Sequence, residues 1–308
     1  MKRPSGLGWT LALAIVLVAL ALAPVLARAL AYPYLTSLAT RAAILAAAAV
    51  SLQVVVGLAG LVSLGHAAFL GIGGYAALGL ATAGMNEAAV SLPVAVAGAG
   101  LFGLVTGRLA LRTRGVTFIM ITLAFAQMAY FVAQSFEVLG GSDGAPLDPP
   151  LLFGTTLLRG PIALHVLALV VLIAFVLGAR VLAASRFGRV LRAATESEAR
   201  VTASGFDVRR ARLAAYVLAG AAGGVAGWLL GVHAGFVSPA MLEWRVSGEL
   251  LVMVILGGAA RPEGAVIGAV GVVAVEEVLS GVSQHWRLIF GALIIGVVLL
   301  RGRRLLPR

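Results

Sequence analysis

The sequence contains no cysteine and few charged residues. The absence of cysteine excludes disulfide bonds, thiol catalysis and cysteine-ligated metal sites. Charged residues make up 11% of the 308 residues, against about 25% in an average soluble domain. Hydrophobic residues make up 61%, and they form runs long enough to cross a bilayer. This composition excludes a soluble enzyme, a disordered chain and a nucleic-acid module, and it predicts an all-α, polytopic transmembrane helical bundle.

Motifs for catalysis and nucleotide binding are also missing. The sequence has no GxxxxGK[ST] loop, so we expect no ATP site of the P-loop type in this chain. Its four histidines are widely separated and show no metal-binding spacing. We therefore predict a non-enzymatic chain with no catalytic residue, no metal and no cofactor of its own. Long arrays of intramembrane acids and bases, expected of a stand-alone secondary transporter, are absent too.

The positive charge is concentrated in a few segments. The formal net charge is +11, and in membrane proteins Lys and Arg collect in cytoplasmic loops. Lys2 and Arg3, the segment 185–212 and the C-terminal arginines are the main basic regions. We therefore predict that both termini and the loop 185–212 are cytoplasmic, and that the charge contacts lipid headgroups rather than nucleic acid.

Apolar segments predict about ten spans (eight to ten) in one integral-membrane domain, residues 1–308. The first is long for a signal-peptide core, so we expect it to remain uncleaved. The eighth is short enough that it must be tilted or re-entrant. The predicted spans are 9–27, 37–56, 64–85, 89–108, 116–136, 162–182, 213–232, 246–256, 265–279 and 288–300.

Glycine-rich breaks interrupt the apolar pattern at corresponding places in the two halves. The first break contains Gly57, Gly60 and Gly65, and the second contains Gly257 and Gly258. Interrupted spans in both halves of a transporter indicate a transport pathway. Glycine also permits close helix packing without any role in transport, and both interpretations stay open.

Polar residues inside the spans are few. His66 begins the third span beside the first break, where it either lines a substrate path or caps a helix. Gln127 and Gln134 lie seven residues apart on one face of the fifth span, near Thr122. Such amides either join helices or contact a ligand.

The basic loop contains a predicted amphipathic helix from Gly188 to Ser204, ended by Gly205. Its apolar residues alternate with charges. A helix of this kind is either a surface helix at the headgroups or a docking element for a cytoplasmic partner.

Five stretches carry a resemblance to a known family. In order along the chain they are GLAGLVSLGHAAF (57–69) through Gly74-Tyr75, RGVTF (114–118) through TLAF (122–125), GGSDG (140–144), Phe187-Gly188-Arg189 through Gly205, and Leu256-Gly257-Gly258. Together they resemble the LivM-like permease subunits of branched-chain amino acid ABC importers, over roughly residues 40–300.

The resemblance implies a permease in the bacterial inner membrane that works without covalent chemistry. Its partners would be a second homologous permease, two cytoplasmic ABC ATPase subunits that bind ATP and Mg, and a periplasmic substrate-binding protein. The cargo would be branched-chain or other hydrophobic amino acids, or alternatively urea, amides or another small polar solute.

The resemblance also implies two sets of site residues. The basic loop would be the coupling helix that docks on the ATPase, and the residues assigned to coupling are Arg189, Arg192, Glu196, Glu198 and Gly205. The residues assigned to the substrate pathway are His66, Phe69, Gly73, Tyr75, Thr122 and Gln127.

Overall fold

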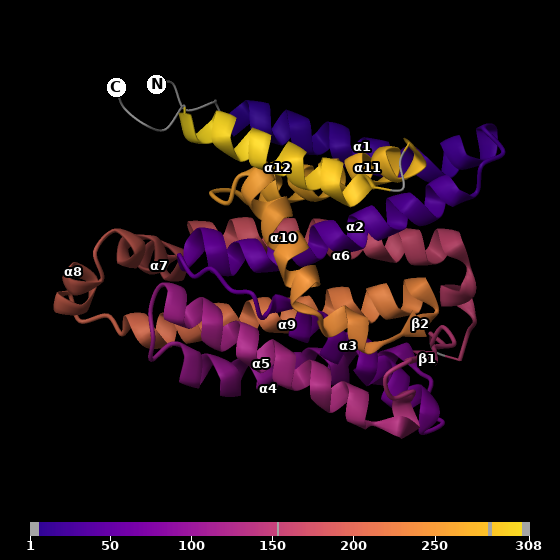
Figure 1. Ribbon diagram of the computed structural model, residues 1–308, viewed down its shortest axis with the longest axis horizontal. Helices are drawn as coiled ribbons and strands as arrows, with labels where there is room; N and C mark the ends of the chain where they lie inside the picture. Colours follow the sequence, from indigo (N-terminus) through magenta and orange to yellow (C-terminus); the bar gives the residue numbers. More distant parts are fainter. Residues whose placement is uncertain (1–5, 153, 283–284, 304–308) are drawn as a thin grey trace.

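The computed structural model describes residues 6–152, 154–282 and 285–303, and it confirms the all-α, polytopic class. The long helices run side by side in Figure 1. The α-helices are α1 (Gly6–Ala29), α2 (Tyr34–Gln53), α3 (His66–Thr82), α4 (Ala88–Ala110), α5 (Val116–Ser135), α6 (Pro161–Ala184), α7 (Arg186–Glu196), α8 (Glu198–Ala203), α9 (Val208–Ala234), α10 (Trp244–Gly257), α11 (Pro262–Val282) and α12 (Trp286–Arg303).

The two ends of the bundle differ. The short helices α7 and α8 project from one end, where α1 begins and α12 ends (Figure 1). The opposite end holds the connection from α5 to α6. Its strand β1 (Ala145–Pro146) pairs antiparallel with β2 (Phe236–Val237), which follows α9. The arginine-rich loop 185–212 and the connection from α5 to α6 therefore lie at opposite ends.

The helix α2 forms the centre of the bundle. Every residue from Ala42 to Gln53 is buried, and the helix contacts α6, α9 and α11. Small side chains allow α3 and α9 to approach closely, because a side chain at Gly73 would overlap the Gly224 backbone. Glycine therefore brings the backbones of two helices into contact where α3 meets α9.

Seven helices among the described residues are long and apolar enough to cross a membrane. The helix α3 has 17 residues and α10 has 14, and both are shorter than this group. In Figure 1, α10 crosses the other helices at a steep angle. The seven long helices are α1, α2 with its C-terminal extension to Leu58, α4, α5, α6, α9 and α11.

The chain between α9 and α10 returns into the bundle. No element is predicted from sequence between residues 232 and 246, but β2 and the 3-10 helix Pro239–Leu242 fold there. This 3-10 helix packs against α3 and α5, and Leu242 is buried. As a result, α10 begins against the side of α5, between the two ends of the bundle.

Candidate functional site

The first break separates α2 from α3. A π-helical turn, Val54–Leu58, ends the α2 rod, and the chain then runs without helical structure from Ala59 to Gly65. Non-helical backbone at membrane depth needs partners inside the protein. The amide of Leu61 donates to the carbonyl of Val55 at 3.1 Å, and the amide of Ala67 donates to Ser247 Oγ at 2.8 Å. Hydrogen bonds within the protein therefore stabilise the break, and one of them comes from Ser247 of α10.

The two breaks touch each other. Gln53 donates its side-chain amide to the carbonyl oxygen of Ala259 at 2.9 Å. A side chain at Gly57 would overlap the same carbonyl, and one at Gly257 would overlap Gly264 in α11. Glycine is thus required at Gly57 and Gly257 for backbone contact. Gly258 has φ +105°, a conformation that L side chains rarely adopt.

His66 is enclosed at the start of α3. Its exposed fraction is 0%, and its Nε2 lies 2.7 Å from Ser51 Oγ. Ser51 donates its single hydroxyl proton to the Ala48 carbonyl, so it accepts from His66 Nε2–H. The rings of His66 and Phe69 meet edge to face, with ring centroids 5.3 Å apart. His66 therefore joins α2 to α3 in this conformation.

Three further pathway residues from the sequence analysis pack in the interior. Phe69 is fully buried and makes edge contacts with the rings of Phe102 and Tyr216. Gly73 lies against α9, as described above. Thr122 is buried and donates its hydroxyl to the carbonyl of Ile119 in its own helix; it also packs against Gly65.

The remaining two pathway residues line cavities on the side of the bundle. Tyr75 lines an apolar cavity of about 560 Å³ between α3, α4 and α5, and its hydroxyl finds no hydrogen-bond partner among the described residues. Gln127 lines a separate cavity of about 550 Å³, between α5 and the start of α10. The structure therefore divides the predicted pathway residues between the packed core and two lateral cavities.

The Gln127 cavity contains charged residues that the sequence analysis did not single out. They are Glu243 and Arg245, which flank Trp244 at the start of α10. Glu243 Oε2 lies 3.4 Å from Arg245 Nε. The other residues that line this cavity are apolar or aromatic: Leu64, Leu123 and Tyr130. In the sequence, Glu243 and Arg245 resemble the charged flank of an apolar span. Their position against α5 follows only from the fold.

The basic loop 185–212, here named the coupling segment after its predicted role, contains two helices, α7 and α8, rather than the single predicted helix. Ser197 has an extended backbone, φ −156° and ψ 98°, and its hydroxyl accepts from the amide of Arg200. This cap starts α8 and separates it from α7. Ser185 caps α7 in the same way through the amide of Gly188. The prediction of one continuous helix was wrong because the local serine cap interrupts the helical pattern.

The predicted coupling residues have different surroundings. Arg189 and Arg192 are exposed, and each donates to a carbonyl at the end of α6, Ala184 and Ala183 respectively. Glu196 is exposed at the end of α7. Gly205 ends α8 with φ +85°, which favours glycine.

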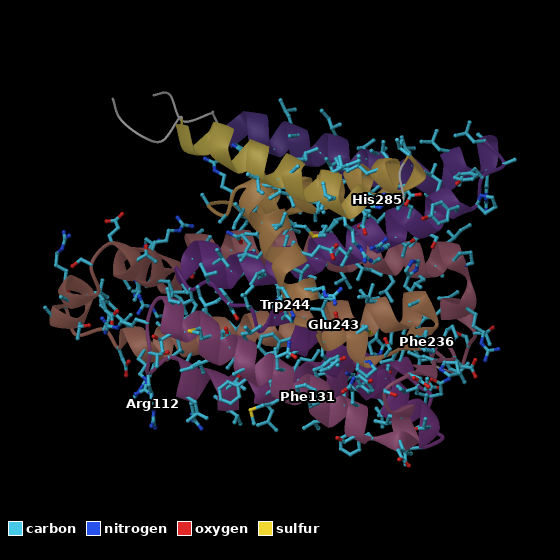
Figure 2. The ribbon with its side chains drawn as sticks, viewed as in Figure 1. Arg112, Phe131, Phe236, Glu243, Trp244 and His285 are labelled. Atoms are coloured by element: carbon cyan, nitrogen blue, oxygen red, sulfur yellow. The ribbon has the colours of Figure 1, made fainter. Side chains whose placement is uncertain are left out.

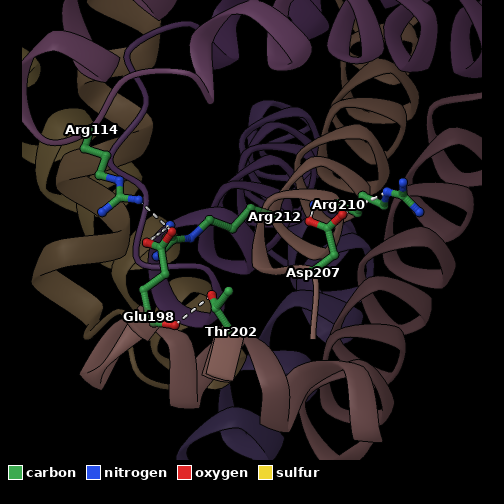
Figure 3. A network of polar contacts seen from close by, with 6 residues as sticks. All are labelled: Arg114, Glu198, Thr202, Asp207, Arg210 and Arg212. Atoms are coloured by element: carbon green, nitrogen blue, oxygen red, sulfur yellow. Dashed lines mark hydrogen bonds and ion pairs between the residues drawn. The ribbon is translucent and has the colours of Figure 1, made fainter. Parts of the chain in front are cut away.

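Glu198 joins three parts of the chain. Its Oε1 accepts from Arg114, in the loop before α5, at 2.8 Å, and its Oε2 accepts from Arg212 of α9 at 2.8 Å (Figure 3). Arg212 is only 16% exposed, whereas Arg114 is 77% exposed. The Arg212 pair is therefore less screened by water than the Arg114 pair.

The coupling segment also touches the first helix break. A Cβ at Gly60 would lie 2.7 Å from the methyl carbon of Thr195 in α7. Gly60 itself has φ +68°. The same region forms a cavity of about 390 Å³, lined by Gly60, Glu198 and Arg212 among others. Displacement of α7 or α8 would therefore act directly on the chain between α2 and α3.

Comparison with known proteins places the chain in a family. The family described as "Branched-chain amino acid transport system / permease component" matches residues 34–298. Two relatives carry the name "High-affinity branched-chain amino acid transport system permease protein LivM". The one from Escherichia coli (strain K12) is 28% identical, over 93% of this chain and 74% of the relative. The one from Salmonella typhimurium (strain LT2) is 28% identical, over 91% and 72%. No solved structure matches the chain significantly.

The match covers most of the bundle, including both helix breaks and the coupling segment. The chain is thus a multi-pass membrane permease subunit of an ABC importer that works with other components of the transporter, and not an enzyme. It belongs to the family of permease components of branched-chain amino acid transport systems.

Proposed function

We propose that this chain translocates branched-chain or other hydrophobic amino acids across the bacterial inner membrane. Its partners are a second, homologous permease, a periplasmic binding protein and two cytoplasmic ATPase subunits. ATP and Mg bind to those ATPase subunits. The names of the relatives support the substrate class, and the absence of a P-loop in the sequence supports ATP hydrolysis on separate subunits.

The α7–α8 end of the bundle faces the cytoplasm in this proposal. Its arginine-rich segment supports that orientation, since short basic loops stay on the cytoplasmic side. The described start of α1 and end of α12 lie at the same end (Figure 1), so both termini would be cytoplasmic. The opposite, β1–β2 end would receive the binding protein.

The observation that carries the mechanism is the contact between Gly60 and Thr195. An ATPase that binds α7 and α8 differently in its open and closed states shifts the equilibrium between two permease conformations. The contact transmits that shift to the break between α2 and α3, and Gln53 transmits it onward to the break before α11. Both breaks then move together as the pathway opens.

Uptake of labelled leucine into cells with and without this chain tests the substrate. We expect leucine uptake to require the chain and urea uptake to be unaffected. The opposite pattern would favour the alternative of urea, amides or another small polar solute. Uptake by the purified chain without any ATPase would favour a stand-alone secondary transporter instead.

Charge reversal at Glu198 tests the coupling role. Glu198→Arg removes both ion pairs and places like charges beside Arg212, so we expect ATP-driven uptake to fall by about tenfold or more, with ATPase binding weakened. The double variant Glu198→Arg with Arg212→Glu restores the α8–α9 pair and should recover part of the uptake. If Glu198→Arg together with Gly205→Pro leaves uptake intact, the coupling role fails.

A further inference from the structure

The cavity between α5 and the start of α10 lies halfway along the bundle. Leu123, Gln127 and Tyr130 line it, and they lie 7 to 14 residues from the start of α5 at Val116. At 1.5 Å per residue this is about 10–21 Å along a helix of roughly 30 Å. Figure 2 agrees, because Glu243 and Trp244 lie between Arg112, near the α7–α8 end, and Phe236, near the β1–β2 end.

Two charges are open to the surroundings at this depth. The side chain of Arg245 is 70% exposed and that of Glu243 is 31% exposed. Charged side chains at the centre of a bilayer are costly, and in membrane proteins they face a bundle interior or a water-filled cavity. The face that carries Glu243 and Arg245 therefore does not face lipid. In an importer with two permeases, it faces the second permease or the pathway between them.

The charges are not satisfied by each other. Their closest atoms are 3.4 Å apart, longer than the 2.7–2.9 Å of a charge-assisted hydrogen bond. The side-chain amide of Gln127 lines the same cavity. The cavity of about 550 Å³ falls in the range of small-molecule sites, which combine apolar walls with a few polar groups.

We propose that this cavity is a contact site for a zwitterionic amino acid on its way through the membrane. Arg245 binds the carboxylate, Glu243 binds the ammonium group, and Gln127 supplies a further hydrogen bond. Leu64, Leu123 and the Trp244 ring form the apolar wall for the side chain of the substrate. A zwitterion carries both charges close together, so it replaces the weak Glu243–Arg245 contact with two direct ones. This assignment rests on the proposed function and adds the residues that recognise the cargo.

Photolabelling of the complete reconstituted transporter tests the site directly. The probe is a diazirine analogue of leucine that keeps its carboxylate and ammonium groups. We expect adducts on residues 123–130 and 243–245. Excess leucine should suppress them, whereas 3-methylbutylamine, which lacks the carboxylate, should not. Leucine-sensitive adducts that map only to other segments would overturn the proposal.

Substitutions in the same complex supply a second test. We expect Arg245→Gln and Glu243→Gln each to lower leucine transport per assembled complex by about tenfold at saturating binding protein. Arg245→Lys should recover part of the loss. Arg28→Gln, an exposed arginine at the end of the peripheral helix α1, is the matched control and should transport normally.

The outcomes separate this inference from the proposed function. If wild-type complex fails to transport leucine, the proposed function fails. If wild-type complex transports leucine but the two variants do so at the same rate per complex, only the site is wrong. A fall in the amount of complex with unchanged turnover would make Glu243 and Arg245 a subunit contact, and would also overturn the site. Variants that do not assemble leave the decision to the photolabelling.

Discussion

Gln53, the last residue of α2, donates its side-chain amide to the backbone carbonyl of Ala259 across 2.9 Å. The two residues lie 206 positions apart. Gln53 precedes the first helix break, and Ala259 lies in the second. The bond therefore connects the two interruptions of the bundle, and any movement of one break must either move the other or cost this hydrogen bond.

The first prediction removes that connection. Gln53→Leu leaves the Ala259 carbonyl without its partner, so we expect unfolding to become easier by about 1–2 kcal/mol. Transport should fall further than stability alone explains, because the breaks no longer move together. Thermal unfolding in detergent and leucine uptake per assembled complex measure the two effects.

Gln134→Leu is the matched control. Gln134 is also a glutamine in a span, but it bonds Tyr130 within its own helix α5 at 2.9 Å. We expect it to retain uptake. Equal losses of uptake in the two variants would show that the Gln53–Ala259 bond has no special role.

The second prediction concerns the contact between Gly60 and the coupling segment. Gly60→Ala forces a non-glycine residue into φ +68° and places its Cβ 2.7 Å from the Thr195 methyl carbon. We expect a loss of about 1–3 kcal/mol from the backbone alone. The displaced Thr195 should also make ATPase activity insensitive to the presence of substrate. Both are measurable in the reconstituted transporter.

Two variants separate strain from contact. Gly84→Ala carries the strain alone, because Gly84 has φ +78° and open space around its Cβ; it should keep ATPase activity coupled to substrate. Thr195→Ser removes the methyl group but keeps the hydroxyl, so it should restore coupling when combined with Gly60→Ala. Loss of coupling in Gly84→Ala would attribute the effect to backbone strain.

The positions of the glycine breaks could be predicted from sequence, but their contact could not. Glycines in an apolar run are a local signal, whereas the approach of Gly57 to Ala259 depends on how α2, α10 and α11 pack. The serine cap at Ser197 has a local signal too, namely a serine followed by Glu198 at a helix start. When residues 188–204 are interpreted as one amphipathic helix, this local signal at Ser197 is overlooked.

The positions of the charged residues at the start of α10 could not be predicted from sequence. Hydropathy assigns Glu243 and Arg245 to the flank of a span, because charge ordinarily ends an apolar segment. The structure places them beside the middle of α5, since the chain after α9 folds back into the bundle. Only tertiary structure contains that information. Conversely, His66 stands out in the sequence as an intramembrane histidine, but the fold encloses it against Ser51.

The third prediction concerns the ion pair between α6 and the start of α11. Arg180 contacts Glu263 Oε1 through Nε at 2.8 Å and Nη2 at 2.7 Å. The Glu263 side chain is 9% exposed and that of Arg180 is 35% exposed. Removing one partner of a fully buried pair costs ~3–5 kcal/mol. Because Arg180 is partly exposed, we expect Glu263→Gln to cost about 2–3 kcal/mol, measured by thermal unfolding of the purified chain.

The pair Arg41–Glu276 is the matched control for this measurement. It also joins two spans, α2 and α11, but its atoms are 3.4 Å apart and its side chains are 41% and 19% exposed. Water screens it more strongly, so Glu276→Gln should cost about 1 kcal/mol or less. The double variant Arg180→Met with Glu263→Gln removes the unpaired charge and should be more stable than Glu263→Gln alone. If Glu276→Gln proves the more damaging single change, burial does not govern these ion pairs.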